Sequence, residues 1–170
     1  MRNRNRACGA MCAALVSALL LTSCSTGAPG SATRESTYPR WEEGAGATEA
    51  AAFMKVQIPE GATDVKGAVQ VNPREDEYIL SFRTDRATAT RVAEDLHSEE
   101  PLKPWRISST SEPELFGHLG LTEPQTLKGA LWAGVCPPCV KDYRRRSVAW
   151  LEIHIENLEA DQARVYLRAF

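Results

Sequence analysis

Residues 147–156, with the sequence SVAWLEIHIE, carry the clearest strand signal in the chain and decide its fold class. Apolar residues alternate with mostly polar ones, so an extended chain presents one apolar face and one largely polar face. The apolar face consists of Ala149, Leu151, Ile153 and Ile155, and the other face of Val148, Trp150, Glu152, His154 and Glu156. This alternation is typical of a strand that buries one face in an antiparallel sheet.

Four other segments have strand signals, over residues 64–71, 77–83, 127–135 and 163–170. The first two alternate on either side of the turn-forming residues 72–76, which predicts an antiparallel hairpin. The last two flank the 147–156 strand in the chain and supply its expected neighbours. The sequence therefore predicts a mostly antiparallel sheet of about five strands.

One main helix is predicted over about residues 85–97. Apolar residues recur there with helical spacing, at Ala89, Val92, Ala93 and Leu96. This spacing places them in one stripe that can cover a sheet. A shorter helix is predicted over residues 49–56, which are good helix formers. The expected fold class is α+β, with one main helix (about 85–97) packed on a mostly antiparallel sheet of about five strands.

Residues 101–126 show no such periodicity. Proline, serine, threonine and glycine occur throughout, with aromatic and aliphatic residues scattered among them. A segment of this length without regular structure is uncommon in a compact domain unless it is functional or contains short elements. The sequence allows a short helix near residues 112–119, and it leaves open whether the segment is a recognition surface or a plain connection.

The N-terminus has the parts of an export signal in order. The first six residues include three arginines, and residues 11–21 form an apolar run. This run is shorter than the ~20 residues that a membrane-spanning helix needs. It ends in Leu21-Thr22-Ser23-Cys24, which resembles the lipobox of bacterial lipoproteins. A lipobox consists of an aliphatic residue, two small residues and the cysteine whose thiolate accepts a diacylglyceryl group.

The lipobox resemblance implies a division of the chain into three parts. Residues 1–23 are a signal peptide that is removed, and Cys24 becomes the first residue and carries acyl chains such as palmitate. Two or three such chains anchor a protein stably to a membrane. Residues 24–48, rich in small and turn-forming residues, are a flexible tether. Residues 49–170 are then a single α+β domain on the extracytoplasmic face of the cell membrane, similar in plan to small lipoproteins of GC-rich Gram-positive bacteria.

Bulk charge excludes one class of partner. Removal of residues 1–23 takes away three of the 20 basic residues and none of the 22 acidic ones, which leaves a net charge of −5. A mildly acidic domain lacks the overall charge of a nucleic-acid-binding protein, so no nucleic acid is expected.

The sequence has no phosphate-binding, dinucleotide-binding, zinc-protease or serine-hydrolase motif. We therefore predict no cofactor and no catalytic residue, and an enzyme is less favoured than a binding or structural protein.

The segment Cys136-Pro137-Pro138-Cys139 has the most evident chemistry. Outside the cytoplasm these two cysteines are free to form a disulfide. With Trp132-Ala133 before it, the segment also resembles the active-site stretch of the thioredoxin family. That resemblance implies that Cys136 is the attacking thiolate and Cys139 the resolving thiol.

The thioredoxin resemblance covers only a short part of the chain. That family has a large part of its domain and a cis-proline after the motif, whereas only 31 residues follow Cys139 and none of them is proline. A structural disulfide is therefore the main interpretation, and redox activity is the alternative. A metal site would need two more ligands, such as Glu152 and His154, but these alternate along a strand as residues of a solvated face do. No metal site is predicted.

Lys141, Arg144, Arg145 and Arg146 form a basic cluster just before the strongest strand. They are candidates for contact with an anionic surface, such as lipid headgroups or wall phosphates. They are also suited to act as charged residues that protect an aggregation-prone strand. Both interpretations leave this segment on the surface.

The sequence as a whole predicts a membrane-anchored extracytoplasmic lipoprotein with a binding or structural role at the cell envelope. The membrane contact is made through the lipid on Cys24, and the ligand is an envelope protein, a wall polymer or a small molecule. The alternative function is a thiol–disulfide oxidoreductase that uses Cys136 and Cys139.

Overall fold

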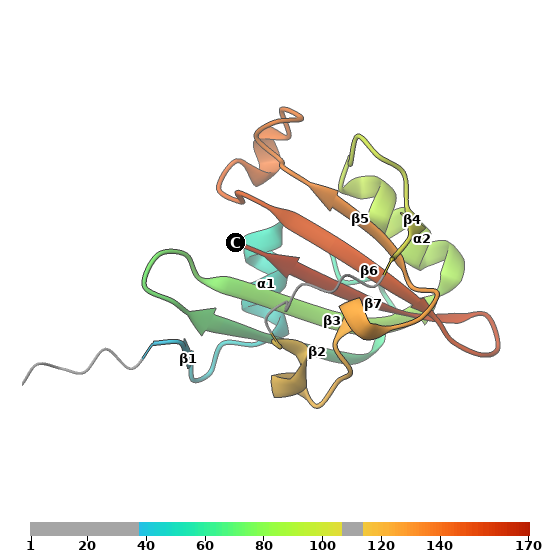
Figure 1. The fold of residues 1–170 in the computed structure, drawn as a ribbon, viewed down its shortest axis with the longest axis horizontal. Helices are drawn as coiled ribbons and strands as arrows, with labels where there is room; N and C mark the ends of the chain where they lie inside the picture. Colours follow the sequence, from blue (N-terminus) through green and yellow to red (C-terminus); the bar gives the residue numbers. More distant parts are fainter. Residues whose placement is uncertain (1–37, 107–113) are drawn as a thin grey trace, which may run out of the picture. The chain divides into compact units, whose positions relative to one another are not determined.

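The computed structural model describes residues 38–106 and 114–170, which lie within one folded unit over Ser36–Phe170. Its centre is a seven-stranded sheet in the order β1-β2-β3-β7-β6-β5-β4 (Figure 1), and every neighbouring pair is antiparallel. The strands are β1 (Arg40–Trp41), β2 (Thr63–Val71), β3 (Glu77–Asp85), β4 (Lys103–Pro104), β5 (Leu131–Val135), β6 (Leu151–Asn157) and β7 (Gln162–Ala169). The predicted signal peptide, Cys24 and the first part of the predicted tether lie outside the described residues.

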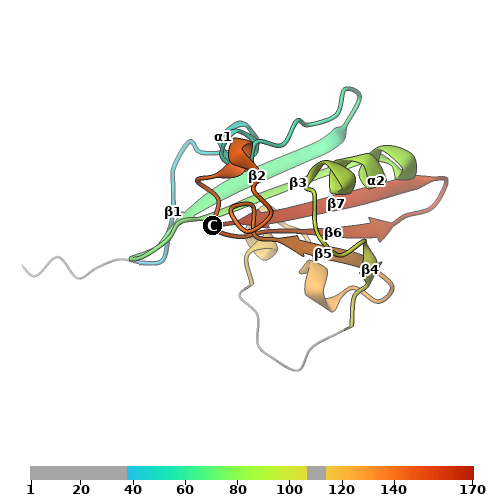
Figure 2. The ribbon, with the colours of Figure 1, turned by 90° about the horizontal axis from the view of Figure 1, so that it is seen from above.

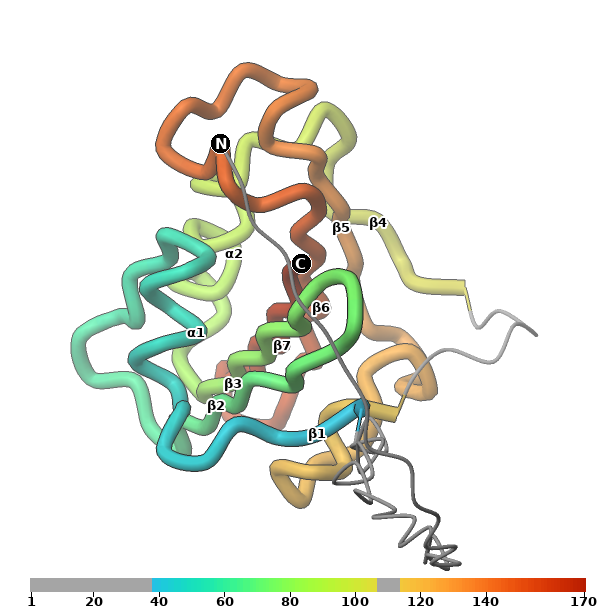
Figure 3. Tube along the Cα trace, turned by 90° about the vertical axis from the view of Figure 1, so that its left-hand side faces the viewer, coloured from blue at the N-terminus to red at the C-terminus, as the bar shows by residue number. Residues whose placement is uncertain are grey.

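Two short helices, α1 (Ala47–Met54) and α2 (Arg86–Asp95), cover the same face of the sheet (Figures 2 and 3). Helix α2 begins directly after β3, where the Asp85 carboxylate accepts a hydrogen bond of 2.8 Å from the Thr88 N–H. An aspartate in this position satisfies one of the free N–H groups of the first turn. The first residue of α1, Ala47, packs against the backbone of Gly67 in β2. A Cβ on Gly67 would lie 2.5 Å from the Cα of Ala47. A glycine is therefore required for this close approach.

The predicted fold class is wrong. The domain is rich in sheet, with seven strands rather than about five, and α2 has only ten residues, so no main helix extends over 85–97. The five longer strands overlap the predicted segments, whereas β1 and β4 have two residues each. Alternation cannot reveal a strand of two residues, because such a strand contains no repeat.

The face of the sheet under α1 and α2, which we call the helix face, is apolar. Leu80 and Phe82 of β3 and Leu151 and Ile153 of β6 are fully buried there, in one cluster with residues of both helices. Burial of this surface supplies the main driving force for folding. The predicted alternation holds from Leu151 on, where Leu151, Ile153 and Ile155 face the helices. Before β6 begins it is reversed, because Val148 is buried in this cluster and Ala149 is exposed.

The opposite face of the sheet, which we call the far face, is partly covered by two short 3₁₀ helices, η1 (Phe116–Leu119) and η2 (Pro124–Thr126) (Figure 2). Phe116 packs edge-on against Tyr166 of β7, with ring centroids 5.3 Å apart. The predicted irregular segment 101–126 therefore contains short elements, and these close a second, smaller apolar cluster. Residues 107–113 of this segment lie outside the described residues.

Residues 40–48, which the sequence assigns to the tether, belong to the folded unit. Trp41 of β1 pairs with Gln70 of β2, and its indole stacks on the His118 ring at a centroid distance of 3.9 Å. Ala47 and Thr48 form the first turn of α1. The folded domain thus begins before residue 49.

Candidate functional site

Cys136 and Cys139 lie in the loop that joins β5 to β6, and a disulfide links them. The loop turns tightly here, since the N–H groups of Cys139 and Val140 both donate to the Cys136 carbonyl, at 2.9 and 3.2 Å. Cys139 is exposed and Cys136 is half-buried. This differs from the thioredoxin resemblance, because the cysteines lie in a loop between adjacent antiparallel strands and Cys139 is the more accessible one.

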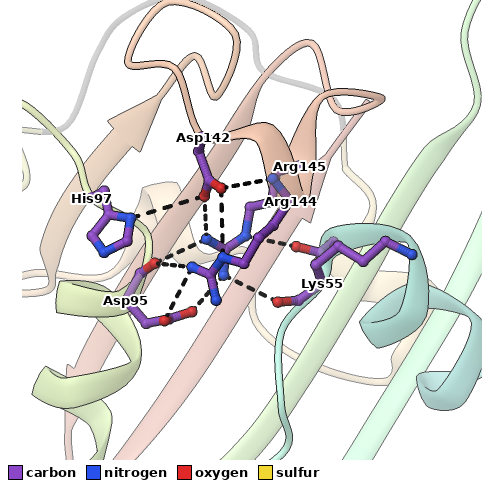
Figure 4. A network of polar contacts seen from close by, with 7 residues as sticks. Lys55, Asp95, His97, Asp142, Arg144 and Arg145 are labelled. Atoms are coloured by element: carbon purple, nitrogen blue, oxygen red, sulfur yellow. Dashed lines mark hydrogen bonds and ion pairs between the residues drawn. The ribbon is translucent and has the colours of Figure 1, made fainter.

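The same loop is fastened to the helices by Arg145, whose side chain is fully buried (Figure 4). Its guanidinium contacts the carboxylates of Asp95, at 2.5 Å, and Asp142, at 2.6 Å. It also donates to the carbonyls of Met54 and Lys55, at 2.9 and 3.1 Å. One side chain thus joins the end of α1, the end of α2 and the β5–β6 loop. The sequence pattern gave no sign of this role.

Both carboxylates of this network are held ionised. Burial alone would raise the pKa of Asp142, but the hydrogen bond and positive charge of Arg145 outweigh it and hold the pKa below its usual range. The pKa of Asp95 is lowered against burial by the same guanidinium and by Arg144. A buried charge of this kind is stable only with such partners.

The four residues of the predicted basic cluster have different environments. Lys141, Arg144 and Arg146 are exposed, and Arg144 pairs with Asp95 at 3.2 Å. Arg145 cannot reach an anionic surface, because its side chain is fully buried. Tyr143 lies between them with 79% of its surface exposed.

An open groove of about 420 Å³ adjoins the disulfide. Trp132 of β5, Trp150 of the β5–β6 loop and the disulfide form its apolar part. Its polar part comes from Ser98, Glu99 and Glu100, which lie between α2 and β4, and from Lys103, the first residue of β4. We call it the tryptophan groove. Its volume and its mixture of aromatic walls with a few polar groups are typical of ligand sites.

Gly134 makes the aromatic wall of the groove possible. A Cβ at this position would lie 2.4 Å from Cζ2 of Trp150 and 2.9 Å from Cζ2 of Trp132. No side chain larger than hydrogen fits without moving an indole. The two rings thus meet over the backbone of β5, next to the edge strand β4.

The polar wall is tied to the same strand. The Ser98 hydroxyl donates to the Gly134 carbonyl at 2.9 Å, which fixes the segment after α2 against β5. The Lys103 ammonium lies over the Trp132 ring, 5.3 Å from its centroid, and also pairs with Glu100. A cation at this distance from an indole face is attracted by the ring's quadrupole.

The far face holds a second group of polar residues, beneath η1 and η2. Arg168 of β7 bridges Glu77 of β3, at 2.7 Å, and Glu152 of β6, at 3.2 Å. His154 of β6 has only 5% of its surface exposed, and its Nε2 has no hydrogen-bond partner among the described residues. Burial, and then the charge of Arg168, lower the pKa of His154 to about 4, so its imidazole is neutral at pH 7.

This second group has little space for a ligand. The cavity that His154 and Arg168 line measures about 10 Å³, which is too small for an organic molecule. Within residues 38–106 and 114–170, no group of three or more His, Cys, Asp or Glu residues is placed to hold a metal ion. No helix in this part of the chain is long and apolar enough to cross a bilayer. The tryptophan groove is therefore the better candidate site.

The fold and the groove define an antiparallel-sheet domain with two helices on one face and a ligand-sized groove at the β5 edge. Comparison with protein-family models, with curated proteins and with solved structures finds no match for this chain. The function must therefore be argued from the site itself.

Sequence reasoning identified part of the groove. Trp132, Cys136 and Cys139 belong to the motif that it singled out, and Trp150 lies on the predicted polar side of its strand. Glu99 and Ser98 carried no signal, because their place depends on the hydrogen bond from Ser98 to a strand 36 residues further along the chain.

Proposed function

We propose that the protein is a lipid-anchored binding module of the cell envelope and that the tryptophan groove is its ligand site. The observation that carries the binding role is the groove itself. Its aromatic wall packs on Gly134, its polar wall is tied to the same residue by Ser98, and both cysteines of the disulfide line it. Such a preformed site loses little conformational entropy when a ligand binds.

The anchoring part of the proposal rests on the sequence Leu21-Thr22-Ser23-Cys24. The disulfide between Cys136 and Cys139 fits an oxidising compartment outside the cytoplasm, where such bonds persist. The test is Cys24→Ala in the native host. We expect the wild-type protein in the membrane fraction with an added acyl mass, and the variant unprocessed or released. Equal membrane retention and equal mass of the two proteins would overturn the anchor.

Thiol–disulfide exchange is a second candidate, because Cys139 is exposed at the rim of the groove. In the reducing direction, one dithiothreitol thiolate attacks the Cys139 sulfur, and the electron pair of the broken S–S bond leaves on Cys136. The second dithiothreitol thiolate then releases Cys139 as a thiolate, which attacks a disulfide of the client. The test is insulin reduction with dithiothreitol as the electron donor. Turnover that disappears in Cys139→Ser would favour exchange over the binding role, and we expect no turnover above the background of dithiothreitol.

A further inference from the structure

We propose that the tryptophan groove binds a cationic ligand, namely a peptide segment with a lysine or arginine side chain. This inference rests on the proposed binding role and names its chemistry. Three properties of the groove support it, which are the charge of its rim, the contact that Lys103 already makes and the shape of its aromatic wall.

The rim of the groove carries more negative than positive charge. Glu99 and Glu100 line it, together with one basic residue, Lys103. Lys103 is already paired with Glu100, whereas Glu99 has no ion-pair partner among the described residues. A neighbouring hollow of about 280 Å³ shares Ser98 and Glu100 with the groove and adds Glu94, which is likewise unpaired within the described chain. A second neighbouring hollow, of about 470 Å³, shares Glu99 with the groove and adds one acidic and one basic residue, Asp142 and Lys141. The groove therefore favours a positive group over a negative one.

Lys103 shows how a cation fits this wall. Its ammonium lies over the Trp132 ring and at the same time pairs with Glu100, so an indole face and a carboxylate hold it together. The groove contains a second indole, Trp150, and a second carboxylate, Glu99, on the same walls. Lys103 is the one basic residue that lines the groove, so these two groups are available to a cation from another molecule.

A basic side chain also matches the groove in its apolar part. The aliphatic stems of lysine and arginine pack against apolar surfaces while their charged heads stay at a polar rim. Within the groove, the two indoles and the half-buried Val140 supply such a surface, and Glu99 and Glu100 are also among its lining residues. A guanidinium has a further advantage, since its plane stacks on aromatic rings and pairs with a carboxylate through two hydrogen bonds.

The test uses the full chain in micelles of a non-ionic detergent and fluorescein-labelled trilysine and triarginine peptides, read by fluorescence anisotropy. We expect saturable binding that weakens with added salt, and no binding of a triglutamate peptide. Glu99→Gln should lower the affinity for triarginine about three-fold, and Trp150→Leu about five-fold. Trp150→Phe, which keeps an aromatic face, should restore part of the loss.

A matched control separates the groove from bulk charge. Glu159→Gln removes the same charge from an exposed residue of the β6–β7 turn, outside the groove, and should leave the affinity unchanged. Equal losses in Glu99→Gln and Glu159→Gln would overturn the proposed site. Binding of chitotriose, but of neither basic peptide, would overturn the cationic ligand and leave the binding role in place. The Cys24→Ala fractionation tests the anchor independently of all these results.

Discussion

The two faces of the sheet are stabilised in different ways. The helix face is a continuous apolar cluster under α1 and α2. The far face has a smaller apolar cluster and a row of charged residues, in which Arg168 bridges Glu77 and Glu152. Apolar burial is non-directional, whereas an ion pair requires both partners in fixed positions. The helix face therefore supplies most of the stability, and the far face contributes to the register of β3, β7 and β6.

Arg145 is the exception that connects the two modes of stabilisation. It belongs to the helix side, but it holds α1, α2 and the β5–β6 loop through hydrogen bonds and ion pairs rather than through apolar contact. Removing one partner of a buried ion pair leaves the other charge uncompensated. This site is therefore expected to be the most sensitive one in the domain.

The largest effect is expected for Arg145→Met. The variant leaves Asp142 buried without its partner and frees the carbonyls at the end of α1, which should lower the free energy of unfolding by about 3–5 kcal/mol. Chemical denaturation gives this value. The neighbouring Arg146, which is exposed, provides the control. Arg146→Met should change the free energy of unfolding by less than about 0.5 kcal/mol. Similar losses in both variants would show that Arg145 does not have the role described.

A smaller effect is expected on the far face, for Arg168→Met. Glu77 and Glu152 then lose a charged partner, and we expect a loss of about 2–3 kcal/mol in the free energy of unfolding. If the far face contributes register rather than bulk stability, hydrogen exchange should accelerate first in β3, β7 and β6. A uniform acceleration over all strands would contradict the contrast between the two faces.

At the edge of the sheet, Gly134→Ala tests the groove wall. The added methyl overlaps the Trp150 and Trp132 rings, so an indole has to move, at a cost of about 1–3 kcal/mol. A shift of the tryptophan fluorescence maximum should accompany this loss. Gly117→Ala is the control, because its Cβ would lie 3.5 Å from Glu123 Oε1, an ordinary contact distance. An unchanged spectrum in Gly134→Ala would mean that the rings do not meet over this residue.

The smallest effect at neutral pH is expected for His154→Leu, which alters the pH dependence of stability. The unfolded histidine has a pKa of about 6.5, whereas the buried one is lowered to about 4. Between these values only the unfolded state takes up the proton, so the stabilisation is complete above pH 6.5 and falls as the pH decreases toward 4. His154→Leu should flatten the stability profile over this range.

The lowered pKa values of Asp95 and Asp142 act at a lower pH. Their contribution is present above the usual aspartate pKa of about 3.9 and is lost as the pH falls further. Acid unfolding below pH 4 should therefore persist in His154→Leu. A profile identical to that of the wild type between pH 4 and 6.5 would show that His154 is not buried in its neutral form.

The sequence predicted the strands with a repeating apolar pattern. It did not predict which side chains are buried through contacts with residues far away in the chain. The 147–156 alternation separates Ile153, which faces the helices, from His154, which faces the far side, as expected for a strand. The three consecutive arginines look equivalent in the sequence, yet only Arg145 is buried. Its place depends on Met54 and Asp95, 91 and 50 residues away in the chain. No local pattern contains that information.

The candidate site shows the same limit. A motif reveals Trp132 and the two cysteines because they are close in sequence. The groove also needs Glu99 and Trp150, which come from different segments. Glu99 is brought to β5 by the hydrogen bond from Ser98 to Gly134, and Trp150 by the pairing of β5 with β6. The composition of residues 136–139 therefore predicts a loop there. It does not predict which residues from other segments lie next to that loop.

The position of β7 has a consequence for how the domain unfolds. This strand lies between β3 and β6, so the sheet hydrogen bonds between the β1-β2-β3 half and the β6-β5-β4 half all pass through it. Loss of β7 would therefore leave the backbone N–H and C=O groups of β3 and of β6 on that side without partners. Because the cluster under the helices also contains residues of both halves, force or heat should open the domain in one all-or-none step.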